Sequence, residues 1–239
     1  MRVFAGPNGS GKTTIFKGIL EDKEVDLGKY VNADEIESLL RRNGQLSLNE
    51  FDLTITEEHI QNFFRNSLFA PIRRKENDLW TKIHVENNTI ICDTKIDSYL
   101  AADIAELLRR ELLKHDISFT YETVMSHAGK IDFMLEAKKR GFRVYLYYIA
   151  TIDPRINISR INVRVAQHGH YVPEELVIAR YYKSLMNLKA AVRACSRAYL
   201  FDNSEQQAQL IAEVEDGKSV FINQINTVPD WISKYLLEA

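Results

Sequence analysis

Short apolar runs alternate along this chain with longer amphipathic stretches. The apolar runs predict β-strands at residues 3–5, 30–33, 88–96, 117–122, 143–150 and 198–201. The amphipathic stretches predict helices at residues 14–20, from 34 onward, after 54, and at 100–115, 130–140 and 173–194. Because strand and helix signals alternate, the pattern predicts an α/β fold with a mainly parallel sheet flanked by helices.

The last part of the chain has a different pattern. Residues 208–223 alternate between apolar and polar on both sides of Glu215-Asp216-Gly217, which predicts a β-hairpin. Pro229 then opens a short final helix that contains Trp231 and Tyr235. We therefore expect a C-terminal β-hairpin and a short helix to follow the parallel part of the sheet.

Length and composition are those of an ordinary globular protein. The 239 residues are 45% hydrophobic and 27% charged, which suits a single α/β domain over 1–239. Residues 41–98 are expected to form an insertion or a segment that binds the acceptor. No apolar stretch approaches the ~18 residues of a membrane span, and no secretory signal is present, so we expect no membrane partner.

Charge and cysteine content narrow the class further. A formal charge of −2 and a pI near 6.3 argue against a protein that coats nucleic acid, since such proteins are usually basic. Cys92 and Cys195 have no metal-ligand spacing and do not make a disulfide framework. These features predict a cytoplasmic protein and argue against nucleic acid as a partner.

The first predicted strand leads into a complete phosphate-binding pattern, G-x-x-x-x-G-K-[ST]. Its residues are Gly6, Pro7, Asn8, Gly9, Ser10, Gly11, Lys12 and Thr13, and Thr14 follows in the predicted helix. The glycines let the backbone wrap closely around phosphate oxygens, and the helix N-terminus favours anions. Lys12 can reach the β- and γ-phosphates, while the Thr13 hydroxyl can bind Mg²⁺. The sequence therefore predicts a site for ATP and Mg²⁺.

Two carboxylates follow predicted strands. Asp34 comes directly after the second strand, where a P-loop kinase fold can use a carboxylate to take the proton of an acceptor hydroxyl. Aspartate is also a preferred N-cap, so a capping role for Asp34 stays open. Glu122 ends another strand, where it can hold a substrate hydroxyl or the metal; the alternative is a solvated carboxylate.

Three arginines follow the longest predicted strand, at positions 155, 160 and 164. Arg160 and Arg164 are four residues apart and share one face of a helix. Guanidinium groups over the triphosphate would neutralise charge on the transferred group, and we therefore predict a lid over residues 153–175. The alternative is a basic helix face paired with surface carboxylates. His170 lies in a turn of this lid that we expect to contact phosphate or substrate.

Another apolar run, at residues 89–93, ends in Asp93. This pattern resembles a Walker B strand, whose aspartate helps to bind Mg²⁺. The alternative is an edge strand within the insertion.

Several motifs, in the same order along the chain, resemble those of the zeta-toxin family of P-loop small-molecule kinases. They are residues 6–13, 31–36, 118–126, 141–144, 160–165, 169–175, 180–188 and 201–204. The resemblance implies ATP-dependent phosphorylation of a sugar hydroxyl, and the founding toxins act on the nucleotide sugar UDP-N-acetylglucosamine. It also implies that Asp34 is the catalytic base and that Lys12 and Arg160 clamp the phosphates.

The same resemblance implies four substrate contacts, from Asn32, Glu122, Thr123 and His170. The founding toxins carry a second lid arginine where this sequence has His170, so Arg164 is expected to supply that charge. The family further implies an antitoxin protein as a partner, although no antitoxin segment is visible in this chain.

Two other functions remain open at this stage. One is a P-loop ATPase or switch without an acceptor, which would not need Asp34 as a base. The other is a module that binds nucleotide without turnover. The presence of Lys12, Thr13, Asp34, Arg160 and Arg164 argues against the second function. Among kinases, an acceptor hydroxyl on nucleic acid is disfavoured by the acidic pI.

Overall fold

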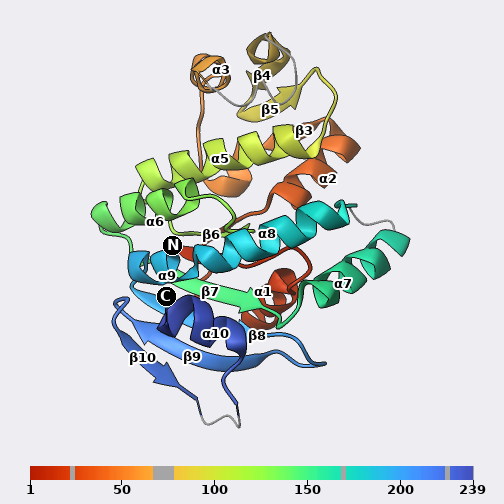
Figure 1. Ribbon diagram of the computed structural model, residues 1–239. Helices are drawn as coiled ribbons and strands as arrows, with labels where there is room; N and C mark the ends of the chain where they lie inside the picture. Colours follow the sequence, from red (N-terminus) through yellow and green to blue (C-terminus); the bar gives the residue numbers. More distant parts are fainter. Residues whose placement is uncertain (22–24, 67–77, 168–170, 224–226, 239) are drawn as a thin grey trace. The chain divides into compact units, whose positions relative to one another are not determined.

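The computed structural model describes residues 1–21, 25–66, 78–167, 171–223 and 227–238, and its helices and strands are drawn in Figure 1. The chain divides into two compact units. The first unit comprises Met1–Asp26 and Thr120–Ala239, and the second comprises Leu27–Phe119. Within the described part of the chain, no helix is long and apolar enough to cross a membrane.

The first unit is built on a mostly parallel sheet. Its strands are β1 (Arg2–Ala5), β6 (Phe119–Thr123), β7 (Tyr145–Ala150), β8 (Arg197–Asp202), β9 (Gln209–Glu215) and β10 (Ser219–Ile222). They lie in the order β10-β9-β8-β7-β1-β6, and the four from β8 to β6 are parallel. Strands β9 and β10 are antiparallel and form the predicted C-terminal hairpin. The predicted α/β class with a mainly parallel sheet is therefore confirmed.

One face of this sheet carries a row of stacked aromatic rings. Phe4, Tyr147 and Tyr199 are register partners on adjacent strands, with ring centroids 4.6 and 5.1 Å apart. Helix α1 (Lys12–Leu20) packs Phe16 edge-on against Phe4 at 5.4 Å. This contact fixes α1, and with it the preceding loop, against the first strand.

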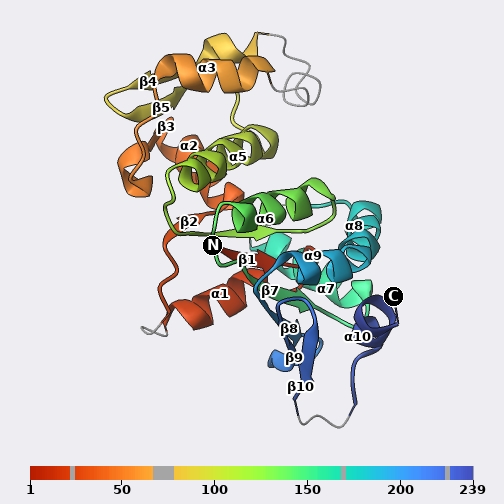
Figure 2. The same ribbon diagram turned by 90° about the vertical axis from the view of Figure 1, so that its left-hand side faces the viewer.

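Helices cover the opposite face (Figure 2). These helices are α6 (Gly129–Lys139), α8 (Glu174–Met186), α9 (Leu188–Ala194) and α10 (Asp230–Ile232). Tyr148, which is fully buried, bonds through its hydroxyl to Ser184 of α8 at 2.9 Å and packs against Trp231 of α10. Helix α7 (Pro154–Ala166) follows β7 and packs on α8, and a last helical turn, η3 (Ser233–Leu237), follows α10.

The predicted helix at 173–194 is two helices in the structure. Helix α8 ends at Met186 and α9 begins at Leu188, with Asn187 between them. The side chain of Asn187 donates to the backbone carbonyl of Met125 at 2.9 Å. The break therefore coincides with a tertiary hydrogen bond, which local helical periodicity does not report.

The second unit combines two long helices with a small sheet. Its elements are β2 (Lys29–Val31), α2 (Ala33–Asn43), β3 (Gln45–Ser47), η1 (Leu48–Phe51), α3 (Glu57–Asn66), η2 (Leu79–Lys82), β4 (Ile83–Glu86), β5 (Thr89–Cys92) and α5 (Ser98–Lys114). Helices α2 and α5 pack against each other. Strands β3, β5 and β4 form an antiparallel sheet in that order, most of which the sequence did not predict.

Two local signals explain the missed or shifted elements of this unit. Strands β4 and β5 are joined by Asn87 and Asn88, whose φ angles of 48° and 59° suit a tight hairpin turn. Helix α3 begins after Thr56, whose hydroxyl accepts from the His59 amide at 3.2 Å. The helix predicted after residue 54 therefore begins at Glu57.

Cys195 offers a direct test of the packing in the first unit. Its side chain is buried, and burial raises the pKa of the thiol to about 12. Because the thiolate is the reactive form, Cys195 should resist iodoacetamide at pH 8 in the folded protein and react once denaturant is added. Peptide mass spectrometry measures both states. Rapid alkylation of Cys195 under native conditions would contradict the packing described here.

Candidate functional site

The phosphate-loop sequence lies between β1 and α1 and packs very closely on its surroundings. Gly6, Gly9 and Gly11 have φ angles of 141°, 74° and 96°, which side chains rarely tolerate. A Cβ at Gly6 would lie 1.9 Å from the Ile149 carbonyl oxygen, and one at Gly9 would lie 2.6 Å from that of Asn157. Only glycine therefore fits these positions.

Two side chains at the start of α1, Lys12 and Thr13, have defined partners. The Lys12 ammonium donates to the carbonyls of Gly6 and Pro7, each at 2.9 Å, so it bridges the start of the loop. The Thr13 hydroxyl donates to a carboxylate oxygen of Glu122 at 3.1 Å. The structure thus brings together two residues that lie 109 positions apart in the sequence.

The phosphate loop, together with Thr13 and Glu122, forms a cradle that suits a magnesium nucleotide. A hydroxyl and a carboxylate are oxygen ligands of the kind that Mg²⁺ prefers, and Thr13 and Glu122 supply one of each. Asn8 Oδ1 and Ser10 Oγ are buried and have no hydrogen-bond partner among the described residues. The cradle therefore offers oxygen ligands for a metal and polar groups that remain available in the loop.

Two asparagines outside the loop bind its backbone. Asn157, in α7 and fully buried, donates from its side-chain amide to the carbonyl of Asn8 at 2.6 Å. Asn203, directly after β8, donates in the same way to the carbonyl of Ser10 at 2.8 Å. The sequence interpretation assigned neither residue a role. Asn203 lies in residues 201–204, one of the motifs that carry the family resemblance. Asn157 lies in no recognised motif, because its role depends on a tertiary contact.

The predicted lid arginines differ in their surroundings. Arg160 donates to the carbonyl of Asn203 at 2.7 Å and to that of Glu205 at 3.2 Å, so it links α7 to the loop after β8. Arg164 lies one turn further along α7 and is exposed. Both arginines lie in the same unit as the phosphate loop.

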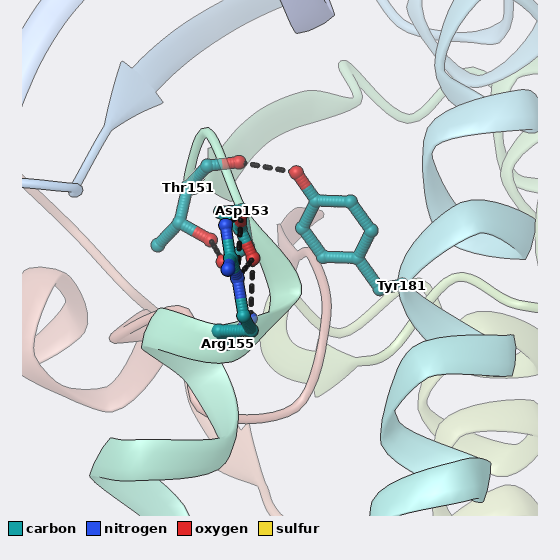
Figure 3. A network of polar contacts seen from close by, with 4 residues as sticks. All are labelled: Thr151, Asp153, Arg155 and Tyr181. Atoms are coloured by element: carbon teal, nitrogen blue, oxygen red, sulfur yellow. Dashed lines mark hydrogen bonds and ion pairs between the residues drawn. The ribbon is translucent and has the colours of Figure 1, made fainter.

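Arg155 is engaged with the start of its own helix, as Figure 3 shows. Its guanidinium forms an ion pair with Asp153 at 2.6 Å, and Asp153 also accepts from the backbone amide of Arg155 as the N-cap of α7. These hydrogen bonds lower the pKa of the Asp153 carboxyl. Nearby, the Tyr181 hydroxyl donates to the Thr151 carbonyl at 2.5 Å, which ties α8 to the end of β7. Arg155 therefore stabilises the helix start.

The turn 202–204 connects several elements of the first unit. Asp202 accepts from the backbone amide of Ser204 at 2.9 Å and from the indole of Trp231 at 2.7 Å. The Ser204 hydroxyl accepts from the Ile152 amide at 2.9 Å. Strand β8, helix α10 and the β7–α7 turn are thus held together at the residue pair that flanks Asn203.

In the second unit, Asp34 is exposed in the first turn of α2. The N-cap of this helix is Asn32, whose side-chain oxygen accepts from the Asp34 amide at 2.9 Å. The alternative in which Asp34 is the cap is therefore wrong. Asn32 also donates to the Tyr30 hydroxyl at 2.7 Å, so its side chain is fixed on both sides.

The remaining predicted residues have varied positions. Asp93 follows β5, the central strand of the antiparallel sheet, and pairs with His84 at 3.2 Å. A Walker B aspartate follows a strand of a parallel sheet, and Asp93 does not, so that interpretation is wrong. The alternative, an edge strand, is also wrong, because β5 lies between β3 and β4. The Thr123 hydroxyl accepts from the Met125 amide at 3.2 Å. His170 lies outside the described residues.

Comparison with known sequences identifies a family. The family model described as zeta toxin matches residues 94–221, which is more than half of the chain. An uncharacterized protein of Haemophilus influenzae (strain ATCC 51907 / DSM 11121 / KW20 / Rd) is 39% identical over 69 residues. That match covers 29% of this chain and 49% of the relative, so the chain spans about half the length of this curated protein.

Solved structures share the fold at low sequence identity. The crystal structures of AvrRxo1-ORF1:AvrRxo1-ORF2 with sulphate ions and with ATP give TM-scores of 0.54 and 0.52 at 14% identity. Both matches cover 92% of this chain, and they cover 60% and 59% of the respective chains. A structure from the PezAT chromosomal toxin-antitoxin system of Streptococcus pneumoniae gives 0.51 at 11% identity, covering 100% of this chain and 79% of that chain.

Proposed function

This chain belongs to the zeta-toxin family, and on that basis we propose that it is an ATP-dependent phosphotransferase acting on a hydroxyl of a small molecule. The observation that carries the proposal is the phosphate loop, with Lys12 bridging its start and Thr13 bonded to Glu122. A neighbour of the same fold was solved with ATP, which agrees with this proposal.

We assign the parts of the reaction to residues as follows. Thr13 and Glu122 would hold Mg²⁺, because their oxygens already lie 3.1 Å apart. Among the roles that the sequence left open for Glu122, this contact favours metal binding. A bound Mg²⁺ would supply positive charge to the phosphate oxygens. Lys12 and Arg160 would stabilise the transferred phosphoryl group, with Arg164 as a second lid charge.

We assign the acceptor side of the reaction to Asp34. Asp34 would take the proton from the acceptor hydroxyl as that oxygen bonds to the γ-phosphorus, and the bond from phosphorus to the ADP oxygen would break. Asn32, Thr123 and His170 remain the proposed substrate contacts. We propose a nucleotide sugar such as UDP-N-acetylglucosamine as the acceptor, which rests on the family alone.

We also propose a partner and a location. A structural neighbour comes from a chromosomal toxin-antitoxin system, and we propose that an antitoxin protein binds this chain. Use of ATP and the presence of two free thiols, Cys92 and Cys195, agree with a cytoplasmic enzyme.

Transfer of labelled γ-phosphate tests the function directly. The purified protein is incubated with Mg²⁺, ATP labelled at the γ-position and a panel of nucleotide sugars, and release of free phosphate is measured in parallel. The proposal expects label in a nucleotide sugar at a rate above phosphate release. Fast phosphate release without any labelled acceptor would instead support the P-loop ATPase.

Replacing Arg160 tests the lid charge. Arg160→Ala should lower kcat by about 100-fold with a smaller change in the KM for ATP, because the charge acts mainly on the transferred group. Arg164→Ala should act in the same direction if it supplies the second charge. Steady-state kinetics and thermal melting of each variant are measured together. A lower melting temperature with unchanged kcat would show that Arg160 only links α7 to the loop after β8.

A further inference from the structure

The phosphate loop presents its carbonyl groups to two side-chain amides. The carbonyl of Asn8 accepts from Asn157 at 2.6 Å, and that of Ser10 accepts from Asn203 at 2.8 Å. The loop residues next in sequence are Gly9 and Gly11, and each packs against the same asparagine that binds the preceding carbonyl. Each asparagine therefore contacts one carbonyl and the glycine that follows it, and the two sets of contacts lie two residues apart along the loop.

Peptide geometry turns each contact into an orientation for an N–H group. A trans peptide unit is planar, and its C=O and N–H point in opposite directions. The Asn8 carbonyl shares a peptide unit with the Gly9 N–H, and the Ser10 carbonyl shares one with the Gly11 N–H. Because the asparagines hold these carbonyls outward, the N–H groups of Gly9 and Gly11 point away from Asn157 and Asn203.

We propose that Asn157 and Asn203 are positioning residues that fix the N–H groups of Gly9 and Gly11 for phosphate binding. Glycine peptide units are the ones most free to rotate, since glycine populates positive and negative φ about equally. A loop that must turn several N–H groups toward one anion needs a donor for each carbonyl that faces outward. The two amides supply those donors. The inference rests on the proposed function, because it assumes that the loop binds a nucleoside triphosphate.

Both asparagines are themselves held in place. The Asn157 side-chain oxygen accepts from the Thr151 hydroxyl, and the whole side chain is buried. The backbone of Asn203 donates to the Ala150 carbonyl at 2.8 Å, and its own carbonyl accepts from Arg160. The Asn157 amide therefore has one orientation that satisfies both of its partners, and the backbone of Asn203 is held on both sides. Asn157 joins helix α7 directly to the phosphate loop, and Arg160 joins the same helix to Asn203, which binds that loop.

Substitution by aspartate removes the donor and adds one negative charge. Aspartate keeps the size of asparagine, but its carboxylate cannot donate to a carbonyl. Asn157→Asp and Asn203→Asp are compared with wild type and with Asn162→Asp, which makes the same change at an exposed position of α7. The probe is a non-hydrolysable ATP analogue with Mg²⁺, and its Kd is measured by calorimetry. Each site variant should bind about 10- to 100-fold more weakly, while Asn162→Asp should bind as wild type does.

Glycine-selective ¹⁵N labelling gives a readout that a general loss of stability would not produce. The chain has ten glycines, so the spectrum is simple to assign. In wild type, the amide protons of Gly9 and Gly11 should both shift downfield on addition of the analogue. Asn203→Asp should abolish the Gly11 shift and spare that of Gly9, and Asn157→Asp should do the reverse. If Asn157→Asp does not fold, Asn203→Asp alone decides the outcome.

The outcomes separate this inference from the proposed function. Wild type that binds the analogue, with both glycine shifts and the Kd unchanged in the variants, would overturn the positioning role and leave the function intact. Equal loss of both glycine shifts in either variant would also overturn it, because that result means general disruption. Wild type that binds no nucleoside triphosphate would overturn both proposals.

Discussion

Lys12→Ala will reduce phosphoryl transfer by about 1,000-fold or more, because it removes the positive charge that we propose to bind the β- and γ-phosphates. In the structure the Lys12 ammonium bonds to the carbonyls of Gly6 and Pro7, so the side chain is already directed into the loop. Loss of these hydrogen bonds should cost the folded state about 1–3 kcal/mol. The protein should therefore fold, and calorimetry should show weakened binding of Mg·ATP.

Lys17→Ala is the matched control for this experiment. Lys17 lies on the same helix, is exposed and would lose the same charge. Its transfer rate should stay within a factor of two or so of wild type, since exposed surface charges contribute little. A Lys12→Ala variant with the wild-type transfer rate would refute the assignment of the nucleotide site.

Asp34→Asn separates a kinase from an ATPase. Asparagine keeps the size of the side chain but cannot take a proton, so transfer to the acceptor should fall by about 100- to 10,000-fold. The helix should be unaffected, because Asn32 and not Asp34 caps α2. ATP binding should also persist. Transfer of labelled phosphate and calorimetry with the non-hydrolysable analogue measure the two effects separately.

Glu35→Gln provides the comparison for Asp34→Asn. Both residues are exposed acidic side chains in the first turn of α2, so each substitution removes one negative charge from the same place. Glu35→Gln should transfer phosphate at nearly the wild-type rate. An Asp34→Asn variant that is equally active would mean that Asp34 is no base and that another group takes the proton.

Local patterns predicted most of the first unit, and tertiary contacts account for the rest. Strand β7 is a continuous apolar run, which is typical of a buried strand. The turn residues Asp216 and Gly217 indicate the hairpin of β9 and β10. The break at Asn187 was not predictable, because the residue is held by the distant Met125 carbonyl. Strands β3 and β4 were missed because each has only three or four residues and no recognised motif follows it, whereas the equally short β1 leads into the phosphate loop.

The site shows the same division. The phosphate loop could be predicted from the sequence because eight consecutive residues carry its chemistry. Glu122 could be predicted as a candidate because it lies at the end of a predicted strand. The hydrogen bond between Thr13 and Glu122 could not be predicted, since it joins segments that are distant in the sequence. Nor could the contacts from Asn157 and Asn203, because a single asparagine in a helix or a turn has no pattern that distinguishes it.

The position of Trp231, whose indole N–H donates a hydrogen bond to Asp202, has a practical consequence for fluorescence measurements. The chain contains two tryptophans, and each unit holds one of them, Trp231 in the first and Trp80 in the second. Trp231 is buried, whereas the Trp80 ring lies 4.0 Å from the guanidinium of Arg65. With Trp80→Phe, the tryptophan fluorescence reports only the first unit, and with Trp231→Phe it reports only the second. Denaturation of the two units can thus be followed one at a time, without any added dye.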